Sequence, residues 1–104
     1  MEVNKEHVVD ASEQGADGLY DYYYAYWLFT FRGGEIALIA RSYDDQPEQV
    51  HFLRKEVVGR NEFLSHNDIA GPLFVEACNY LRKVERMTVI EVLKAGGYEE
   101  VRLK

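Results

Sequence analysis

The chain has little cysteine and no long apolar run. Its single cysteine, Cys78, excludes an internal disulfide, and an ordinary thiol is what we expect of a cytoplasmic protein. No apolar run approaches the roughly 18 residues that a membrane helix needs. Residues 1–10 are polar and lack the apolar segment of a secretory signal. We therefore expect no signal in this segment and no membrane among the partners.

Positive charge is also scarce. The chain has 12 Lys and Arg residues against 18 Asp and Glu residues, which gives a formal net charge of -6 at pH 7. Such a protein should be soluble at neutral pH, and phosphate backbones and anionic lipid should repel it. The RNP-type patterns of RNA-binding sheets are absent as well. Charge and motifs together argue against nucleic acid as a partner.

Motifs of metal, cofactor and catalytic sites are missing too. His7, His51 and His66 occur in no HxH or HxxxH spacing, and the chain has no CxxC pair. The two Gly-Gly pairs lack the spacing of a phosphate-binding loop. Cys78 falls on the apolar stripe of a predicted helix, where a small core residue is expected rather than a thiolate. We therefore predict no metal, no cofactor and no catalytic residue, and nothing in the sequence identifies an enzyme.

The composition is that of one small globular domain. The 104 residues suffice for a single modest core without the help of a disulfide or metal. Hydrophobic residues make up 47% and charged residues 29%, which argues against a disordered chain. Residues 1–18 are polar and predict a flexible N-terminal arm, so the single α+β domain is expected over residues 19–104.

A pair of glycines at residues 33 and 34 predicts the first β-hairpin. Gly-Gly between two extended runs is typical of a type I′ turn, which needs positive φ at both central residues. Counting outward from this loop places large residues opposite small ones and apolar residues opposite apolar ones. The expected pairs include Phe31–Ile36, Phe29–Leu38, Trp27–Ala40, Tyr26–Arg41 and Tyr24–Tyr43.

This pairing divides an aromatic segment into two faces. Residues 19–45 hold six of the eight tyrosines and the only tryptophan. The face without hydroxyls or charges is the predicted core face, covered by the helix, and Trp27 and Phe29 should be almost fully buried there. It carries Ala25, Trp27, Phe29, Phe31, Ile36, Leu38 and Ala40. The opposite face carries Tyr22, Tyr24, Tyr26, Leu28, Thr30, Ala37, Ile39, Arg41 and Tyr43.

The second half of the chain predicts one helix and a further hairpin. Pro72 suits the first position of a helix whose apolar stripe runs through Leu73, Phe74, Ala77, Cys78, Leu81 and Val84. Gly96 and Gly97 predict a loop between strands near residues 88–95 and 98–103. Its expected pairs are Lys94–Glu99, Val92–Val101, Glu91–Arg102 and Ile90–Leu103.

Residues 47–58 fit either a helix or a strand, and the turn-rich residues before them favour a strand. The predicted order is therefore β-β-β-α-β-β. It describes an α+β fold, in which a curled antiparallel sheet of about five strands packs one main helix on one face. The order of the strands within the sheet is not determined by the sequence.

The tyrosine-rich face is the candidate site. It can be ordinary half-exposed sheet surface, or it can be a binding surface, because Tyr and Arg are enriched in interface hot spots. The candidate binding residues are Tyr24, Tyr26, Arg41 and Tyr43. Our first hypothesis is a small protein–protein interaction domain, whose partner is a second copy or another protein that it adapts or neutralises. The alternative is a small-molecule-binding domain or weak enzyme with a pocket near Asp44, Asp45 and His51.

Overall fold

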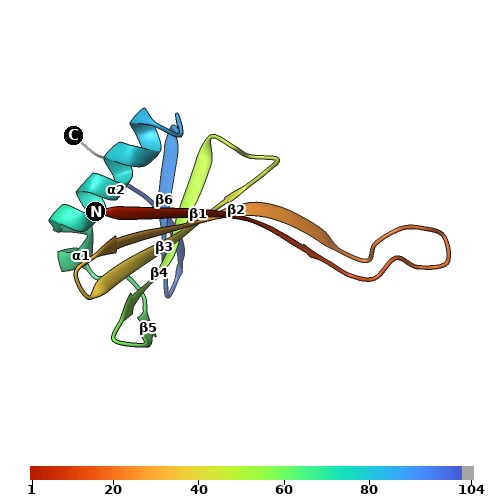
Figure 1. Ribbon diagram of the computed structural model, residues 1–104, viewed down its shortest axis with the longest axis horizontal. Helices are drawn as coiled ribbons and strands as arrows, with labels where there is room; N and C mark the ends of the chain where they lie inside the picture. Colours follow the sequence, from red (N-terminus) through yellow and green to blue (C-terminus); the bar gives the residue numbers. More distant parts are fainter. Residues whose placement is uncertain (102–104) are drawn as a thin grey trace.

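The computed structural model describes residues 1–101, and within them the chain forms a curled sheet with one main helix. Seven strands make up this described sheet; six follow the order β1-β2-β3-β4-β6-β7, and β5 pairs with β4 (Figure 1). The predicted α+β class is confirmed. The strands are β1 (Glu2–Ala11), β2 (Tyr23–Gly33), β3 (Ile36–Tyr43), β4 (Gln49–Val57), β5 (Arg60–Glu62), β6 (Val89–Lys94) and β7 (Gly97–Glu100), and the helices are α1 (His66–Ala70) and α2 (Pro72–Lys83).

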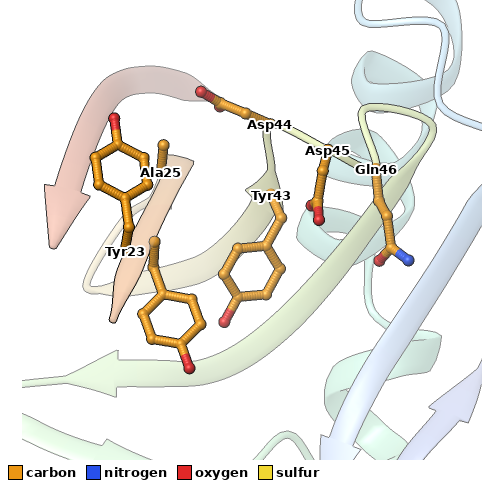
Figure 2. Close-up of a pocket in the computed structure, with 7 residues that line it drawn as sticks. Tyr23, Ala25, Tyr43, Asp44, Asp45 and Gln46 are labelled. Carbon is orange, nitrogen blue, oxygen red and sulfur yellow. The ribbon is translucent and has the colours of Figure 1, made fainter. Parts of the chain in front are cut away.

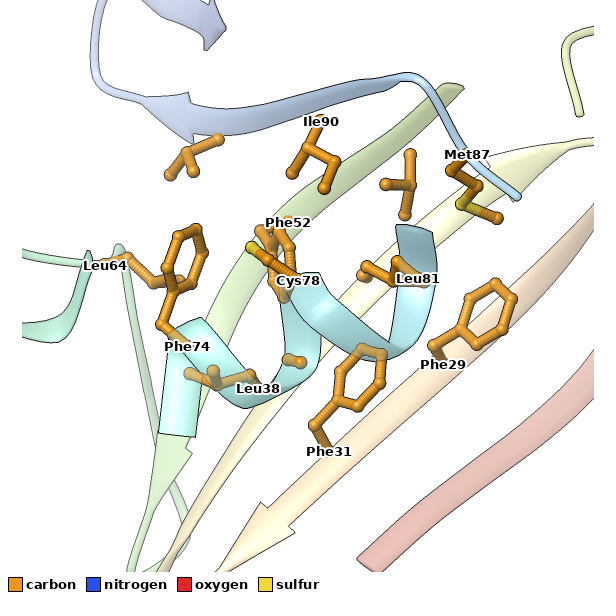
Figure 3. Packing of buried hydrophobic residues seen from close by; sticks show 14 residues of the cluster. Phe29, Phe31, Leu38, Phe52, Leu64, Phe74, Cys78, Leu81, Met87 and Ile90 are labelled. Carbon is orange, nitrogen blue, oxygen red and sulfur yellow. The ribbon is translucent and has the colours of Figure 1, made fainter. Parts of the chain in front are cut away.

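Helix α2 covers one face of the sheet. It begins at Pro72, as predicted, because proline lacks the N–H that would have no partner in the first turn. The predicted stripe is buried at its centre, whereas Val84 lies past the end of the helix and is exposed. Figure 3 shows the resulting core, in which residues of α2 meet aromatic and aliphatic residues of the strands: Phe74, Cys78 and Leu81 with Phe29, Phe31, Phe52 and Ile90.

The short helix α1 is fixed at its start by a capping box. The Ser65 side chain accepts a hydrogen bond from the Asp68 backbone N–H, and the Asp68 carboxylate accepts one from the Ser65 backbone. Lys55 on β4 adds an ion pair with Asp68 at 2.8 Å. Burial would raise the pKa of Asp68, but the hydrogen bonds from Lys55 and Ser65 outweigh it and leave that pKa lowered. The chain between the sheet and α2 is thereby held to β4.

Strand β4 is the segment for which the sequence favours a strand over a helix, and this prediction is confirmed. It pairs antiparallel with β3, with an extra residue, Leu53, between the partners of Ile39 and Ala40. It pairs parallel with β6, because the chain crosses over through the two helices between these strands. The expectation of an antiparallel sheet is therefore wrong for this one pair.

The first hairpin turns one residue later than predicted. Gly33 pairs with Ile36, so the loop consists of Gly34 and Glu35, and the partner of Tyr26 is Tyr43 rather than Arg41. Gly34 has a φ of 61°, as a glycine at the first central position of a type II′ turn requires. Gly33 has another role: a Cβ there would lie 2.9 Å from a methyl group of Leu73. The slip amounts to two residues in pairing, so both predicted faces keep their members.

The second hairpin turns one residue earlier than predicted. Lys94 pairs with Gly97 and Val92 pairs with Glu99, so Ala95 and Gly96 form the loop. The predicted partners of Lys94 and Val92 are therefore wrong, and so is that of Glu91, which pairs with Glu100. Arg102 and Leu103, the predicted partners of Glu91 and Ile90, lie outside the described part of the chain. Gly97 has a φ of 122°, so this hairpin, like the first, contains a glycine with positive φ.

Residues 2–11 form a strand rather than the loose arm that the sequence predicts. Strand β1 pairs with β2 along its whole length, from Glu2 opposite Arg32 to Ala11 opposite Tyr23. It is an edge strand, and polar or charged residues fill most of its positions. Charges along an edge are typical, because they discourage pairing with other chains. They also hide the apolar alternation by which a strand is recognised in a sequence.

The tip of the hairpin formed by β1 and β2 projects from the body of the molecule. This hairpin tip, residues 12–22, is held by a bridge between Gln14 and Tyr20 and by hydrogen bonds from the backbone of Asp21 and Tyr22 to the Ser12 hydroxyl. Figure 1 shows it extending far beyond the other strands. The molecule is accordingly elongated, measuring 50 × 30 × 28 Å.

Trp27 is not in the core, contrary to the prediction, whereas Phe29 on the same face is. The indole is 37% exposed because α2 ends at Lys83, before the sheet does. Side chains from the edge strand flank it instead: Lys5 Nζ lies 4.6 Å from the centre of the indole ring, and the His7 ring centre lies 4.8 Å away. A cation over an indole is a favourable contact, although a partly exposed one contributes little.

The turn between β4 and β5 contains a strained residue. Val57 pairs with Arg60, which leaves Val58 and Gly59 as a two-residue loop. Both have positive φ, at 49° and 79°, which is the pattern of a type I′ turn. Glycine adopts this conformation freely, but a valine resists it because its branched side chain crowds the backbone.

Replacing Val58 by asparagine should raise the free energy of unfolding by about 1 kcal/mol, because asparagine tolerates the left-handed conformation. Val58 is 78% exposed, so the change sacrifices little apolar burial. Urea unfolding of both proteins measures the difference. Val58→Ala is the control and should gain less, since alanine is less at ease with positive φ than asparagine is. An asparagine variant less stable than the wild type would contradict this turn geometry.

Candidate binding surface

The sheet face opposite α2 carries the candidate site. Alternate residues of β2 point to this face. Strand β3, which pairs with β2, contributes Arg41 and Tyr43, and β7 contributes Tyr98. At the end near the first turn, Ala37 and Ile39 are buried. The other end is aromatic, and we define it as the tyrosine surface: Tyr22, Tyr24, Tyr26, Arg41, Tyr43 and Tyr98.

Ring contacts connect the tyrosine surface from the hairpin tip to the body. The rings of Tyr22 and Tyr24 stack with centres 6.1 Å apart, and Tyr24 and Tyr43 are 6.2 Å apart. Tyr43 also meets the edge of Tyr26 at 5.9 Å. These separations fall in the range of favourable aromatic pairs. The rings therefore form one continuous row rather than isolated exposed side chains.

Arg41 ends this row. Its guanidinium carbon lies 4.7 Å from the centre of the Tyr43 ring and 5.8 Å from that of Tyr26, and its Nη2 donates a hydrogen bond of 3.2 Å to the Tyr98 hydroxyl. Its Nε is buried and has no hydrogen-bond partner among residues 1–101. Tyrosine rings and one hydroxyl thus hold a guanidinium that makes no ion pair within the described residues.

The structure brings the four predicted binding residues together. Tyr24 is 52% exposed, whereas Tyr26, Arg41 and Tyr43 are half-buried. Sequence reasoning missed Tyr98, because only the order of the strands reveals that β7 lies close enough for its hydroxyl to reach Arg41. That these residues bind a partner remains a prediction.

A groove opens where the tyrosine surface reaches the end of β3. The last ladder hydrogen bond runs from the Asp44 N–H to the Ala25 carbonyl at 3.0 Å, and the chain then turns away while β2 continues toward the hairpin tip. The groove between them has a volume of about 450 Å³. Figure 2 shows its lining, which consists of Tyr23, Tyr24, Ala25, Tyr43, Asp44, Asp45 and Gln46.

The two aspartates of this turn point in different directions. The Asp44 carboxylate is directed away from the Tyr43 ring in Figure 2, and its Oδ2 lies 2.8 Å from His7 Nε2 on β1. The Asp45 carboxylate lies on the same side of the turn as the Tyr43 ring. Within residues 1–101 no cationic side chain pairs with Asp45. The groove therefore contains one carboxylate that is already occupied and one that is not.

His51 does not join these aspartates. It pairs with Arg41 across the sheet, its ring centre lies 4.6 Å from that of Tyr98, and its Nε2 lies 3.5 Å from Glu91 Oε1. Of the three residues predicted near the alternative pocket, Asp44 and Asp45 line the groove and His51 does not.

His51 is buried, and burial lowers its pKa below the ordinary 6.5. The neighbouring Glu91 carboxylate acts in the opposite direction, and the positive charge of Arg41 lowers the pKa further. His51 is therefore neutral in the folded protein at neutral pH. Its Nδ1 is buried and has no hydrogen-bond partner among residues 1–101, so a protonated ring would hold an unpaired N–H at that atom.

Other reactive groups are shielded rather than poised for chemistry. Cys78 is fully buried, and burial raises the pKa of its thiol to about 12, so it is the small core residue that the sequence predicts. Burial together with the hydrogen bond to Glu85 raises the pKa of Tyr80 to about 12. In the described part of the chain, no cluster of His, Cys, Asp or Glu side chains has the makings of a metal site.

Acidic residues gather at the groove and the hairpin tip. Between Lys5 and Arg32 the chain has no Lys or Arg, and between Arg41 and Arg54 it again has none. The first stretch contains five acidic residues and the second contains three: Glu6, Asp10, Glu13, Asp17 and Asp21, then Asp44, Asp45 and Glu48. The tyrosine surface therefore ends in a region of strongly negative charge.

Comparison with known proteins finds no relative of this chain: no protein-family model matches it, nor does a curated protein or a solved structure. Neither helix within residues 1–101 has the length and apolar character to span a membrane.

The wild-type protein should lose stability as the pH falls from about 7.5 to about 5.5, through the ordinary pKa of histidine. A lowered pKa in the folded state means that the unfolded chain takes up the His51 proton first, so acid favours unfolding. His51→Gln removes this contribution and should lose less stability over the same interval. Urea midpoints at the two pH values measure the effect.

His66→Gln, which replaces an exposed histidine on α1, is the matched control and should respond to pH as the wild type does. Equal losses of stability in wild type and His51→Gln would show that the His51 environment is not the one described.

Proposed function

We propose that this chain is a protein–protein interaction domain that binds a partner through the tyrosine surface. One observation carries the proposal: a continuous row of tyrosines ending in Arg41 lies on a sheet face that neither described helix covers. Tyrosine and arginine are both enriched in interface hot spots, and the large rigid ring of tyrosine buries much area at small entropic cost. The sheet side that holds the core is already occupied by α2.

The hairpin tip supports the same proposal. An isolated pair of strands is at best marginally stable in water. The tip nevertheless displays large side chains to solvent, with Leu19 67%, Tyr20 46% and Tyr22 48% exposed. Exposed apolar side chains that are contiguous mark association surfaces more often than single ones do. Contact with a partner would cover them and stabilise the projecting strands.

The partner that fits best is another protein rather than a second copy of this chain. A twofold dimer places the same patch of both copies together. Here that patch adjoins five acidic residues between positions 6 and 31 with no Lys or Arg among them. Two such regions would repel each other, since like charges that meet across an interface oppose association.

Peptides selected by the wild-type protein from a random library displayed on phage should bind the double variant Tyr24→Ser/Tyr43→Ser at least about ten-fold more weakly, because two central aromatic contacts are lost. Neither residue belongs to the core cluster, so the variant should keep its fold. Binding is measured by surface plasmon resonance, and circular dichroism checks the fold. Val75→Ser/Val84→Ser is the matched control: it removes two exposed apolar side chains from the helix side and should bind normally.

Selected peptides that bind the tyrosine variant and the wild type equally would overturn the proposal. If the double variant unfolds, Tyr24→Ser alone serves the same test, since this side chain is 52% exposed. A wild-type protein that sediments as a dimer, with the tyrosine variant sedimenting as a monomer, would replace the foreign partner by a second copy.

A further inference from the structure

We infer that the groove beside Tyr24, Tyr43 and Asp45 receives a cationic side chain, and that the partner presents a segment rich in Arg or Lys. This inference rests on the proposed function and gives its partner a chemical character. It requires three features: a field that attracts cations, a surface that accepts a guanidinium or ammonium group, and a carboxylate free to pair with it.

The electrostatic field that attracts cations to the groove comes from the uneven distribution of charged residues along the chain. Every Lys and Arg of the chain except Lys5 lies at position 32 or later, and none lies between positions 42 and 53. The groove is built from Tyr23 to Ala25 and Tyr43 to Gln46, so both of its walls belong to the stretches without basic residues. Carboxylates concentrated at one end of a protein attract basic partners and repel acidic ones.

The surface that accepts a cation is demonstrated within the molecule itself. Arg41 already lies against Tyr43, with its guanidinium carbon 4.7 Å from the ring centre. One step along the row, Tyr24 and Tyr43 stand with ring centres 6.2 Å apart at the groove. Tyrosine rings attract cations through their negative faces, and the attraction grows when water is excluded. The groove thus offers a pair of tyrosine rings at a separation close to that of the pair beside Arg41, where Tyr26 and Tyr43 are 5.9 Å apart.

The free carboxylate distinguishes the groove from the surroundings of Arg41. Asp45 lies on the Tyr43 side of the turn and makes no ion pair within residues 1–101 (Figure 2). Asp44 is adjacent in sequence, but its carboxylate is engaged by His7 at 2.8 Å. A guanidinium in the groove would therefore meet one carboxylate, which accepts strong charge-assisted hydrogen bonds, and aromatic rings on which its plane can stack. The volume of about 450 Å³ lies within the range of pockets that hold small groups.

A fluorescently labelled peptide that alternates arginine and glycine tests the inference by fluorescence anisotropy with the complete chain. The wild type should bind it, should not bind the same peptide with glutamine in place of arginine, and should bind more weakly as salt is added. Asp45→Asn should weaken binding about ten-fold, as expected for the loss of a charge-assisted contact. Asp45→Glu keeps the charge and should restore much of the affinity.

Asp44→Asn is the matched control, because it makes the same change of charge in the same turn on the side that His7 occupies. It should weaken binding by less than about three-fold, the effect of general charge alone. Equal losses in Asp44→Asn and Asp45→Asn would overturn the groove as the site. Thermal unfolding checks that both variants fold; if Asp45→Asn does not, Asp45→Ser replaces it.

The results separate this inference from the proposed function. If the arginine peptide does not bind, but library peptides bind in a way that needs Tyr24 and Tyr43, the interaction domain stands and the cationic partner is wrong. If library peptides bind without needing these tyrosines, the proposed function fails together with the inference. Binding of the arginine peptide that depends on Asp45 and on both tyrosines supports both.

Discussion

The length of one helix limits how much of the sheet this chain can bury. Helix α2 has 12 residues and is about 18 Å long, whereas β2 has 11 residues and spans about 36 Å. Only the part of β2 near the first turn can lie under the helix, which is why Phe29 and Phe31 are buried and Trp27 is not. The opposite face of β2 is covered by neither described helix and has to remain compatible with water, and tyrosine meets this need with a ring that packs and a hydroxyl that stays solvated. The candidate surface is thus a consequence of a core built on one face of the sheet.

The faces of the first hairpin could be predicted from the sequence, but its register could not. The period of two along a strand separates Phe29 and Phe31 from Tyr24 and Tyr26 whatever the loop, and a slip of two residues in pairing leaves this separation intact. A Gly-Gly pair does not reveal which glycine turns the chain. Gly34 does so here, while Gly33 is small because Leu73 of α2 packs against it, a tertiary contact far away in the sequence. In the second hairpin the displacement is in the opposite direction, because the loop begins at Ala95, one residue before the glycine pair.

Strand β1 and the neighbours of Arg41 were beyond sequence reasoning for a different reason. The edge strand has exposed residues at most of its positions, so its composition resembles that of a polar segment. Tyr98 comes next to Arg41 only because the chain returns from the helices to lay β6 parallel to β4 and then turns back as β7. Local patterns contain no information about such a return. The four tyrosine-surface residues chosen from the sequence come together because they belong to one hairpin, whose pairing is local. Tyr98 comes from β7, which reaches them only through the return of the chain.

The projecting hairpin tip places charge far from the centre of mass. Acidic residues without basic neighbours lie at one end of a molecule 50 Å long, and nearly all Lys and Arg residues lie toward the other. The protein is therefore an electric dipole as well as an anion. In the field of a highly charged body, such a molecule experiences a torque before any contact forms, so its orientation at encounter is not random. Lowering the ionic strength lengthens the distance over which this alignment acts, and the rate of productive collision then depends on how far the tip stands out from the sheet.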